Sequence, residues 1–319
     1  MHLRRTKGGS PPGTARVSRP YRLLCLIAGT FLVLDPRMRG TADLVVASFD
    51  GGVVVLDQPR GRVHRSYGTG RLTPAEVQRR QVFTQHVSAP QFWVLDGGAA
   101  VEEELVDGAH LGDLTAQERG EVVTTLVEQF AALTAAHTGE PAPLTDRDLE
   151  QLLQDAQVPS GFAHAWANAE TEWFPPSAPW IPSPREANAK NLVVRPDGRP
   201  APIDLGDLQV DPCFIYPVGI LIATGDETMR RFLSGAADYS IPLLVATAGR
   251  RWSGTPSQRR GLLLARIVYA AFKDASVDGE SDRGVFEASL SRRWDEVRAV
   301  FAESAEPGER ARGRRARLG

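Results

Sequence analysis

Residues 184–207 read PREANAKNLVVRPDGRPAPIDLGD. Two short apolar runs, Leu192–Val194 and Ala201–Ile203, flank a Pro-Asp-Gly turn signal in this stretch and predict a β-hairpin. Asn191 stands where the chain enters the hairpin, and Asp204 stands where the chain leaves it. Because a hairpin brings its two ends together, an amide oxygen and a carboxylate are expected to converge. Oxygen ligands of this kind suit a magnesium ion, whose coordination shell is then completed by phosphates and water.

Glu186 lies in the loop before the hairpin, five residues ahead of Asn191, where its carboxylate could face the hydroxyl group of a substrate. Each of these residues also has a simpler interpretation. Asp204 could cap the turn after the hairpin, and Asn191 could be an ordinary turn asparagine. Glu186 could be a solvated loop carboxylate or the partner of Arg185. The stretch therefore predicts a metal and substrate site and leaves a purely structural role open.

The first half of the chain is rich in short β-like runs joined by turn signals. A helix is predicted to begin at Thr73-Pro74-Ala75-Glu76, which combines a capping residue, a proline at the first helical position and a glutamate at the third. Strands are predicted at residues 44–48, 53–56, 62–67, 92–95 and 99–105.

From residue 108 onward the sequence pattern is mostly helical. Thr115 to Glu118 is a second capping box, and apolar residues then recur at helical spacing up to Leu133. Residues 257–275 and 284–303 are also predicted to be helical, whereas residues 141–183 are rich in Pro and Trp and give no clear pattern. The fold class is therefore α+β, with a small β-rich part followed by a larger helical part.

The stretch around the hairpin resembles the catalytic loop of kinases, H-x-D-x-x-x-x-N followed by a hairpin and an aspartate that binds metal. The helical second half and the I-D-x-G motif are similar to those of the aminoglycoside phosphotransferase and choline kinase family. The resemblance covers roughly residues 43–300. Its other pieces are a hinge strand and turn at 101–108, an L-x-x-x-H helix end at 133–137 and the Asp-Pro pair at 211–212.

This resemblance implies a two-lobed, protein-kinase-like fold. Residues 41–107 would form a small antiparallel β lobe with one helix, and residues 108–306 would form a mostly helical lobe. A nucleoside triphosphate, ATP or another, would bind between the lobes with Mg²⁺. The residues implied to hold these groups are Asn191 and Asp204 for the metal, Arg65, Glu76, Gly51, Gly52 and Glu104 for the nucleotide, and Glu186 for the acceptor.

The departures from the family pattern are informative. Pro184 replaces the loop histidine, Glu186 replaces the catalytic aspartate, and Arg65 replaces the strand lysine that holds the phosphates. The glycine-rich loop is shortened to the segment that ends in Gly51 and Gly52. Two functions therefore remain open. The chain is expected to be a phosphotransferase acting on a hydroxyl of a small molecule or peptide, or alternatively a pseudokinase that binds nucleotide as a scaffold.

Arg65 and Glu76 each have a structural alternative. Arg65 could be an exposed strand arginine, and Glu76 is already explained by its capping box. Glu76 is, however, the only acidic residue between Asp57 and Asp96. If a carboxylate pairs with the strand cation as the family resemblance implies, Glu76 is therefore the expected partner.

Aromatic residues and His137 are assigned to packing by default. The six tryptophans are mostly expected in the core, although Trp173 and Trp180 could line an acceptor pocket. His137 is expected to be a packed histidine at a helix end.

Composition narrows the functional classes. The chain has 319 residues and a formal net charge of -2, which gives no reason to expect nucleic acid as a partner. Its two cysteines, Cys25 and Cys213, are too few for a disulfide framework or a thiolate zinc site, so the cytoplasm is the expected location.

The two ends of the chain are expected to lie outside the folded lobes. Residues 1–40 form a basic extension that contains an apolar run at 23–34, shorter than the roughly 20 residues that a membrane-spanning helix needs. The run has the outline of a signal peptide but no cleavage pattern, and the alternatives are a buried helix or a helix lying on a membrane. A membrane-surface enzyme is thus a third possible function. Residues 307–319 are expected to be a disordered basic tail.

Overall fold

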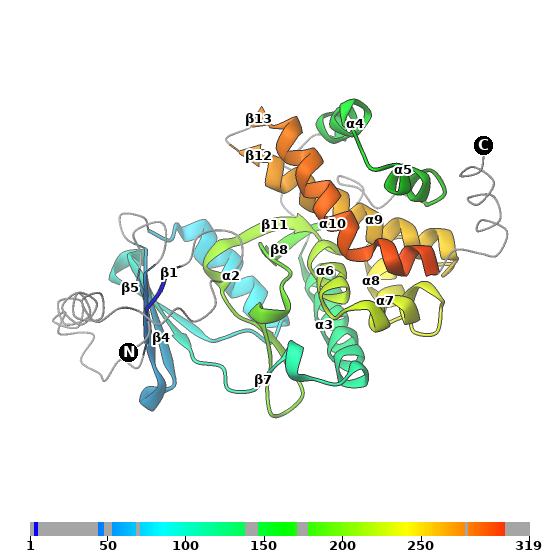
Figure 1. Ribbon diagram of the computed structural model, residues 1–319. Helices are drawn as coiled ribbons and strands as arrows, with labels where there is room; N and C mark the ends of the chain where they lie inside the picture. Colours follow the sequence, from blue (N-terminus) through cyan, green and yellow to red (C-terminus); the bar gives the residue numbers. More distant parts are fainter. Residues whose placement is uncertain are drawn as a thin grey trace, which may run out of the picture. The chain divides into compact units, whose positions relative to one another are not determined.

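The computed structural model describes residues 3–5, 44–47, 53–67, 71–137, 146–170, 178–277 and 280–303. The chain divides into two compact units (Figure 1). A sheet unit contains residues up to Thr84 together with Ala89–Asp107, and a helical unit contains Gln85–Ser88 and the residues from Gly108 onward. The predicted apolar helix at 23–34 and the predicted tail at 307–319 lie outside the described residues.

The sheet unit is built on one six-stranded sheet with the order β1-β2-β3-β4-β6-β5. The predicted meander is confirmed, since β2, β3 and β4 pair antiparallel in sequence. The first strand lies in the stretch assigned to the N-terminal extension and pairs parallel with β2. The strands are β1 (Leu3–Arg5), β2 (Leu44–Ala47), β3 (Val53–Asp57), β4 (Arg62–Ser66), β5 (Phe92–Leu95) and β6 (Ala100–Glu104).

Helix α2 (Pro74–His86) begins at the predicted capping box. The backbone N–H of Thr73 donates to Glu76 Oε2 at 2.6 Å, and the backbone N–H of Glu76 donates to Thr73 Oγ1 at 3.2 Å. These two bonds satisfy donors that a helix N-terminus otherwise leaves unpaired. Phe83 and Arg80 are the buried side chains of this helix.

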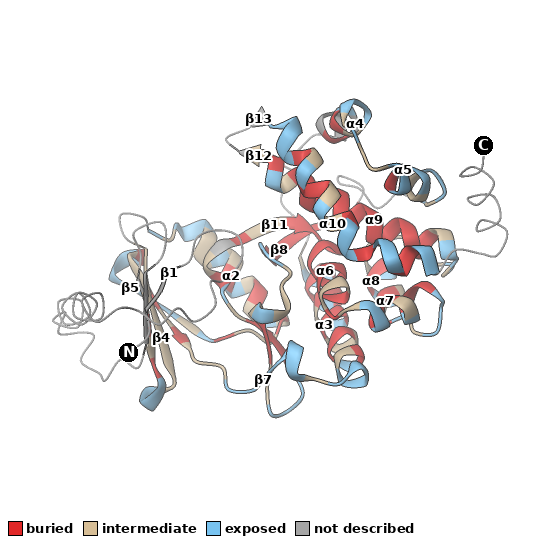
Figure 2. Cartoon of the chain, in the orientation of Figure 1, coloured by how far each residue is buried: buried red, intermediate tan, exposed pale blue. Residues whose placement is uncertain are grey.

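The helical unit is organised around α9, whose side chains are buried along most of its length (Figure 2). Helices α6 and α10 pack against α9, and α3 packs against α6 and α8. Stacking of Phe130 on Tyr216, with ring centroids 5.4 Å apart, joins α3 to α6. The helices are α3 (Ala116–Ala136), α4 (Asp146–Asp155), α5 (Ser160–Ala167), α6 (Ile215–Ala223), α7 (Asp226–Leu233), α8 (Ile241–Thr247), α9 (Pro256–Ala275) and α10 (Arg283–Glu303).

Two small sheets hold the stretch that contains the predicted site. The predicted hairpin is confirmed as β9 (Leu192–Val194) and β10 (Pro200–Pro202), and the short strand β7 (Ala109–His110) pairs with β9. A second ladder joins β8 (Trp180–Pro184) to β11 (Leu208–Pro212), with Pro184 opposite Leu208. This ladder was not predicted, because prolines at positions 182 and 184 argue against a strand unless it has an unpaired edge. A two-stranded ladder provides such an edge on each strand.

Smaller elements complete the chain. Thr115 caps α3 through the reciprocal capping box that the sequence predicts. Within the described residues, no helix is both long enough and apolar enough to cross a membrane. The remaining elements are the 3₁₀ turns η2 (Gln58–Arg60), η3 (Asp96–Gly98), η4 (Leu111–Asp113), η5 (Ala189–Asn191) and η6 (Leu205–Asp207), and the strands β12 (Ser276–Val277) and β13 (Glu280–Ser281).

Gly108 has a structural reason to be glycine. Its φ is 153°, and a Cβ atom at this position would lie 2.0 Å from the carbonyl oxygen of Val194. Gly198, in the hairpin turn, also has a positive φ, 81°, but faces open space. The close approach at Gly108 therefore lets β7 reach β9.

We predict that Gly108→Ala destabilises the protein more than Gly198→Ala. The second substitution adds only backbone strain, about 1–2 kcal/mol, whereas the first adds a steric overlap that costs a further 1–3 kcal/mol, roughly. Urea unfolding of both variants measures the difference. Equal losses would contradict the packing of β7 against β9.

Candidate functional site

The ladder between β8 and β11 closes the base of the loop and hairpin. The loop with Glu186 leaves β8 directly after Pro184, and the segment with Asp204 returns to β11 at Leu208. Within this closed segment, the backbone N–H of Ile203 donates to the carbonyl oxygen of Asn191 at 2.8 Å. The hairpin therefore brings the backbone of Asn191 next to the residue before Asp204, as the sequence predicts.

Asp204 has the backbone conformation of a constrained residue. Its φ and ψ are 63° and 54°, in the left-handed region that non-glycine residues seldom occupy. It precedes the 3₁₀ turn η6, yet its side chain makes no capping hydrogen bond there, and the residue is exposed. The capping role considered for Asp204 is therefore not what the structure shows. Such backbone strain persists where the surroundings impose it, and it is concentrated at functional sites.

The donor set at the end of the hairpin fits a magnesium ion. Asn191 and Asp204 supply an amide oxygen and a carboxylate, both hard oxygen ligands. Among the described residues, no group of three His, Cys, Asp or Glu side chains could hold a metal by itself. A metal bound at Asn191 and Asp204 would complete its shell with ligand phosphates and water, as magnesium commonly does.

Asn188 shapes the loop that carries Glu186. Its side-chain oxygen accepts the backbone N–H of Lys190 at 3.0 Å, and its carbonyl oxygen accepts that of Asn191 at 2.9 Å. Its own N–H donates to the carbonyl oxygen of Glu186 at 3.1 Å. Glu186 itself is exposed. Asn188 was not singled out from the sequence, although asparagine is a typical residue for such local side-chain to backbone bonds.

Asp211 has a structural partner on α9. The ammonium group of Lys273 donates to both carboxylate oxygens of Asp211 at 2.8 Å, and the hydroxyl of Tyr269 donates to one of them at 3.2 Å. Asp211 is 1 % exposed. Burial lowers the pKa of Lys273, although its attraction to Asp211 acts in the opposite direction. This ion pair therefore ties β11 to α9.

Arg65 and Glu104 lie on opposite faces of the six-stranded sheet. Arg65 on β4 is paired with Val101 on β6, and side chains alternate between faces along a strand. Glu104 is thus on the face shared by His64 and Glu102, which form a contact of 3.4 Å. The structure does not bring the side chains of Arg65 and Glu104 together.

Glu103 provides a carboxylate that the sequence analysis did not consider. Arg80 of α2 forms a hydrogen-bonded ion pair with Glu103 of β6, and both side chains are buried. The guanidinium carbon of Arg80 also lies 4.9 Å from the centre of the Phe92 ring. A carboxylate outside the interval from Asp57 to Asp96 therefore pairs with a cation of α2, because β6 lies within reach of that helix.

Glu76 uses its carboxylate in the capping box with Thr73. Its pairing with Arg65 stays a prediction. Burial raises the pKa of the Tyr67 hydroxyl, and the positive charges of Arg80 and Arg65 act in the opposite direction.

The other predicted site residues have mixed outcomes. Gly51, Gly52 and Trp173 lie outside the described residues. Trp180 is a buried residue of β8 whose ring meets that of Tyr269 edge to face, so it packs in the core as the default expectation has it. His137 is the C-cap residue of α3, at the helix end as expected. Trp93 departs from the core expectation, since it is 39 % exposed.

No protein-family model matches the chain, and no curated protein matches its sequence. Among solved structures, aminoglycoside phosphotransferase APH(4)-Ia is 15% identical, with 88% of this chain and 100% of that chain covered and a TM-score of 0.50. Aminoglycoside 2'-phosphotransferase-IIIa, in its GDP complex, is 14% identical, with 88% and 99% covered and a TM-score of 0.50. A choline/ethanolamine kinase family protein from Mesorhizobium loti is 13% identical, with 89% and 96% covered and a TM-score of 0.47.

These similarities show the fold of the chain. It is the protein-kinase-like α+β fold that the sequence predicts from the loop and hairpin.

We predict that Asp211→Asn lowers the free energy of unfolding by about 3 kcal/mol or more, because Lys273 keeps its charge in a buried place without its partner. Combining it with Lys273→Met should restore much of the loss. Denaturant unfolding measures both changes. Any magnesium-dependent ligand response of the native protein should survive in Asp211→Asn, and loss of that response alone, with stability unchanged, would show that Asp211 acts at the metal instead.

Proposed function

We propose that the chain is a phosphotransferase that uses a magnesium-bound nucleoside triphosphate and phosphorylates a hydroxyl group of a small molecule or peptide. The observation that carries the proposal is the end of the hairpin. The bond from Ile203 to Asn191 sets the two predicted metal ligands at adjoining backbone positions, and Asp204 is exposed in a strained conformation. The left-handed conformation of Asp204 is not needed to form a hairpin.

The roles of the residues follow from their chemistry. A bound magnesium ion would neutralise phosphate charge as it develops during transfer. Asn191 and Asp204 would hold that ion, and Asn188 keeps the intervening loop in shape. Glu186, exposed in the loop, would accept a hydrogen bond from the acceptor hydroxyl and orient its oxygen. Positioning and charge neutralisation account for most of catalysis in such sites, so a conventional base is not required.

The nucleotide is inferred from the same arrangement. Aminoglycoside 2'-phosphotransferase-IIIa, which shares the fold, was solved with GDP. For this chain we infer ATP or another nucleoside triphosphate, with Arg65 as the residue that neutralises phosphate in place of a lysine. Arginine can do so, although its planar fork needs a wider site.

A nucleotide-binding pseudokinase is the second candidate. It is favoured by the buried pair of Arg80 on α2 and Glu103 on β6, a helix-to-sheet ion pair that uses neither Arg65 nor Glu76, and by Glu76 serving its own helix cap. Pro184 adds to this, since it is a buried strand residue where the family has its loop histidine. The scaffold function would keep nucleotide binding and lack transfer.

The proposed nucleotide binding predicts that Mg·ATP stabilises the protein and that Asp204→Ala abolishes this effect. A ligand that binds only the folded state adds about 2.7 kcal/mol at 100 times its dissociation constant. Thermal unfolding with and without nucleotide and metal measures the effect. Asp197→Ala is the matched control, because Asp197 is an exposed carboxylate in the turn of the same hairpin. An unchanged melting temperature at saturating Mg·ATP would contradict both candidate functions.

A further prediction separates phosphate transfer from nucleotide binding. Glu186→Gln should bind Mg·ATP like the parent but transfer phosphate roughly 100-fold more slowly, because it loses a positioned carboxylate. Glu186→Asp should keep part of the activity. The assay follows labelled phosphate from ATP into a panel of hydroxyl compounds, with Glu121→Gln on the exposed face of α3 as the control. Parental transfer by Glu186→Gln would remove Glu186 from the mechanism.

A further inference from the structure

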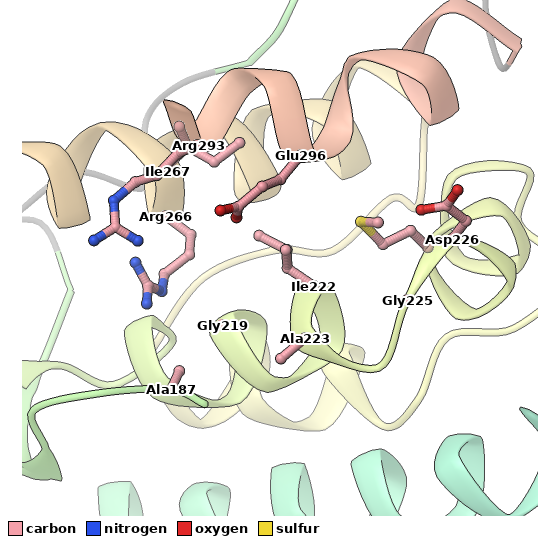
Figure 3. A pocket seen from close by; sticks show the side chains of 11 residues that line it. Ala187, Gly219, Ile222, Ala223, Gly225, Asp226, Arg266, Ile267, Arg293 and Glu296 are labelled. Carbon is pink, nitrogen blue, oxygen red and sulfur yellow. The ribbon is translucent and has the colours of Figure 1, made fainter. Parts of the chain in front are cut away.

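A pocket opens inside the helical unit, beside the loop that carries Glu186. Its volume is about 280 Å³, near the lower end for small-molecule sites. Helices α6, α7, α9 and α10 supply most of its lining, and Ala187, the residue after Glu186, completes it. Arg266 of α9 and Arg293 of α10 lie at the same end of the pocket (Figure 3).

Arg266 is a buried cation that is incompletely hydrogen-bonded among the described residues. It is 8 % exposed, and within the described part of the chain its Nε atom has no acceptor. Arg259, two turns earlier on α9, shows the usual arrangement. Its guanidinium donates to the carbonyl oxygens of Gly254 and Phe232, both at 3.0 Å, and pairs with Asp238. Buried charges are normally satisfied in this second way, because an unpaired one is costly.

The nearby carboxylates already have other partners. Asp211 is taken by Lys273 and Tyr269. Asp274 accepts hydrogen bonds from Ser289 at 2.5 Å and from Arg293 at 2.8 Å. Burial acts to raise the pKa of Asp274, but these bonds outweigh it and hold the pKa below its ordinary value. Neither carboxylate forms a hydrogen bond or ion pair with Arg266 in the described part of the chain.

The charge on Arg266 persists at neutral pH. Burial lowers the pKa of Arg266 to about 10, and the neighbouring charge of Arg293 acts in the same direction as burial. The charges of Asp211 and Asp274 act to raise this pKa but do not outweigh burial. Burial and the charge of Arg293 work against the charged form, and an anion in the pocket would oppose both. The carboxylate of Glu296 also lines the pocket, but it forms no ion pair with either arginine among the described residues. Asp226 lies at the far end of the pocket in Figure 3 and pairs with Arg230 at 3.7 Å.

Gly219 of α6 leaves the space that the guanidinium of Arg266 occupies. A Cβ atom at this position would lie 2.7 Å from Arg266 Nε and 2.3 Å from the Cβ of Ala187. The side chain of Arg266 and the loop residue Ala187 therefore meet over the same helix position. A glycine inside a helix costs about 1 kcal/mol relative to alanine, and this close approach accounts for it.

We propose that this pocket binds an oxyanion group, a carboxylate or a phosphate, through the guanidinium of Arg266 with Arg293 adding positive charge. Arg266 would recognise the anion by charge-assisted hydrogen bonds, the strongest kind available to it, while Arg293 keeps its bond to Asp274. Because the pocket reaches the residue after Glu186, we assign the anion to the acceptor, which would then be an acid that carries a hydroxyl group. That assignment rests on the proposed phosphotransfer, whereas the anion site itself does not.

The test of the site uses the full chain without nucleotide or metal. Sodium phosphate and sodium acetate are titrated against sodium chloride at matched ionic strength, and binding is followed by calorimetry and thermal unfolding. We expect phosphate or acetate to stabilise the parent beyond chloride. Arg266→Met should weaken this binding about tenfold or more. In chloride alone the same variant should melt at or above the parental temperature, because it removes an unpaired buried charge.

Two arginines serve as controls. Arg259→Met removes a satisfied buried guanidinium from the same helix, so it should lower the melting temperature and keep the response to the anion. If that variant does not fold, Arg298→Gln on the exposed face of α10 is the control. It should keep the parental melting temperature and the parental response to the anion. An equal response to phosphate, acetate and chloride in the parent would overturn the site. So would an unchanged response in Arg266→Met.

A separate arm tests the acceptor assignment. Hydroxy acids and their neutral alcohol analogues are compared as acceptors for labelled phosphate from ATP. Arg266→Met should raise KM for the acid about tenfold or more and leave KM for ATP unchanged. Preference for the neutral analogues would overturn the assignment. Transfer to neither class, with anion binding intact and sensitive to Arg266→Met, would instead count against the proposed function and leave the anion site standing.

Discussion

The antiparallel pairing of β8 with β11 is the constraint on which the candidate site depends. It holds Pro184 opposite Leu208, so both ends of the intervening loop and hairpin are fixed. Asp211, within β11, is in turn held to the core helix α9 by Lys273. A loop of this length with free ends would sample many conformations, and ordering it during a reaction would cost entropy. The ladder removes that cost before any ligand arrives, which is the condition for positioned catalytic groups.

Polar side chains of the core helix α9 hold two different segments of the helical unit. Near its start, Gln258 and Arg259 are buried and fully engaged with backbone carbonyl and N–H groups of the loop before the helix. Further along, Tyr269 and Lys273 reach β11. Arg266 lies between these two regions and takes part in neither. Buried charges are normally paired, so the unsatisfied Nε of Arg266 supports the proposed anion site.

The sequence predicts those parts of the fold that neighbouring residues along the chain determine. The hairpin followed from two apolar runs and a Pro-Asp-Gly turn, and α2 and α3 began at their Thr-x-x-Glu capping boxes. It did not predict β8 and β11, whose prolines obscure the strand pattern. Nor did it predict the pair of Arg80 and Glu103, which joins helix α2 to strand β6 over 23 residues of chain. Gly219 and Arg266 were equally out of reach, because spacing along a chain does not report which residues approach in space.

The approach of Ala187 to Gly219 has a consequence for how this protein can diverge. A side chain at position 219 would need the space that Ala187 and Arg266 now occupy. The three positions therefore cannot drift independently. A related protein with a larger residue at position 219 would need a displaced loop at position 187 or a shorter side chain at position 266. Substitutions at positions 187, 219 and 266 should therefore be correlated among related proteins. Because all three residues line the pocket, such correlated changes would alter its shape and charge together.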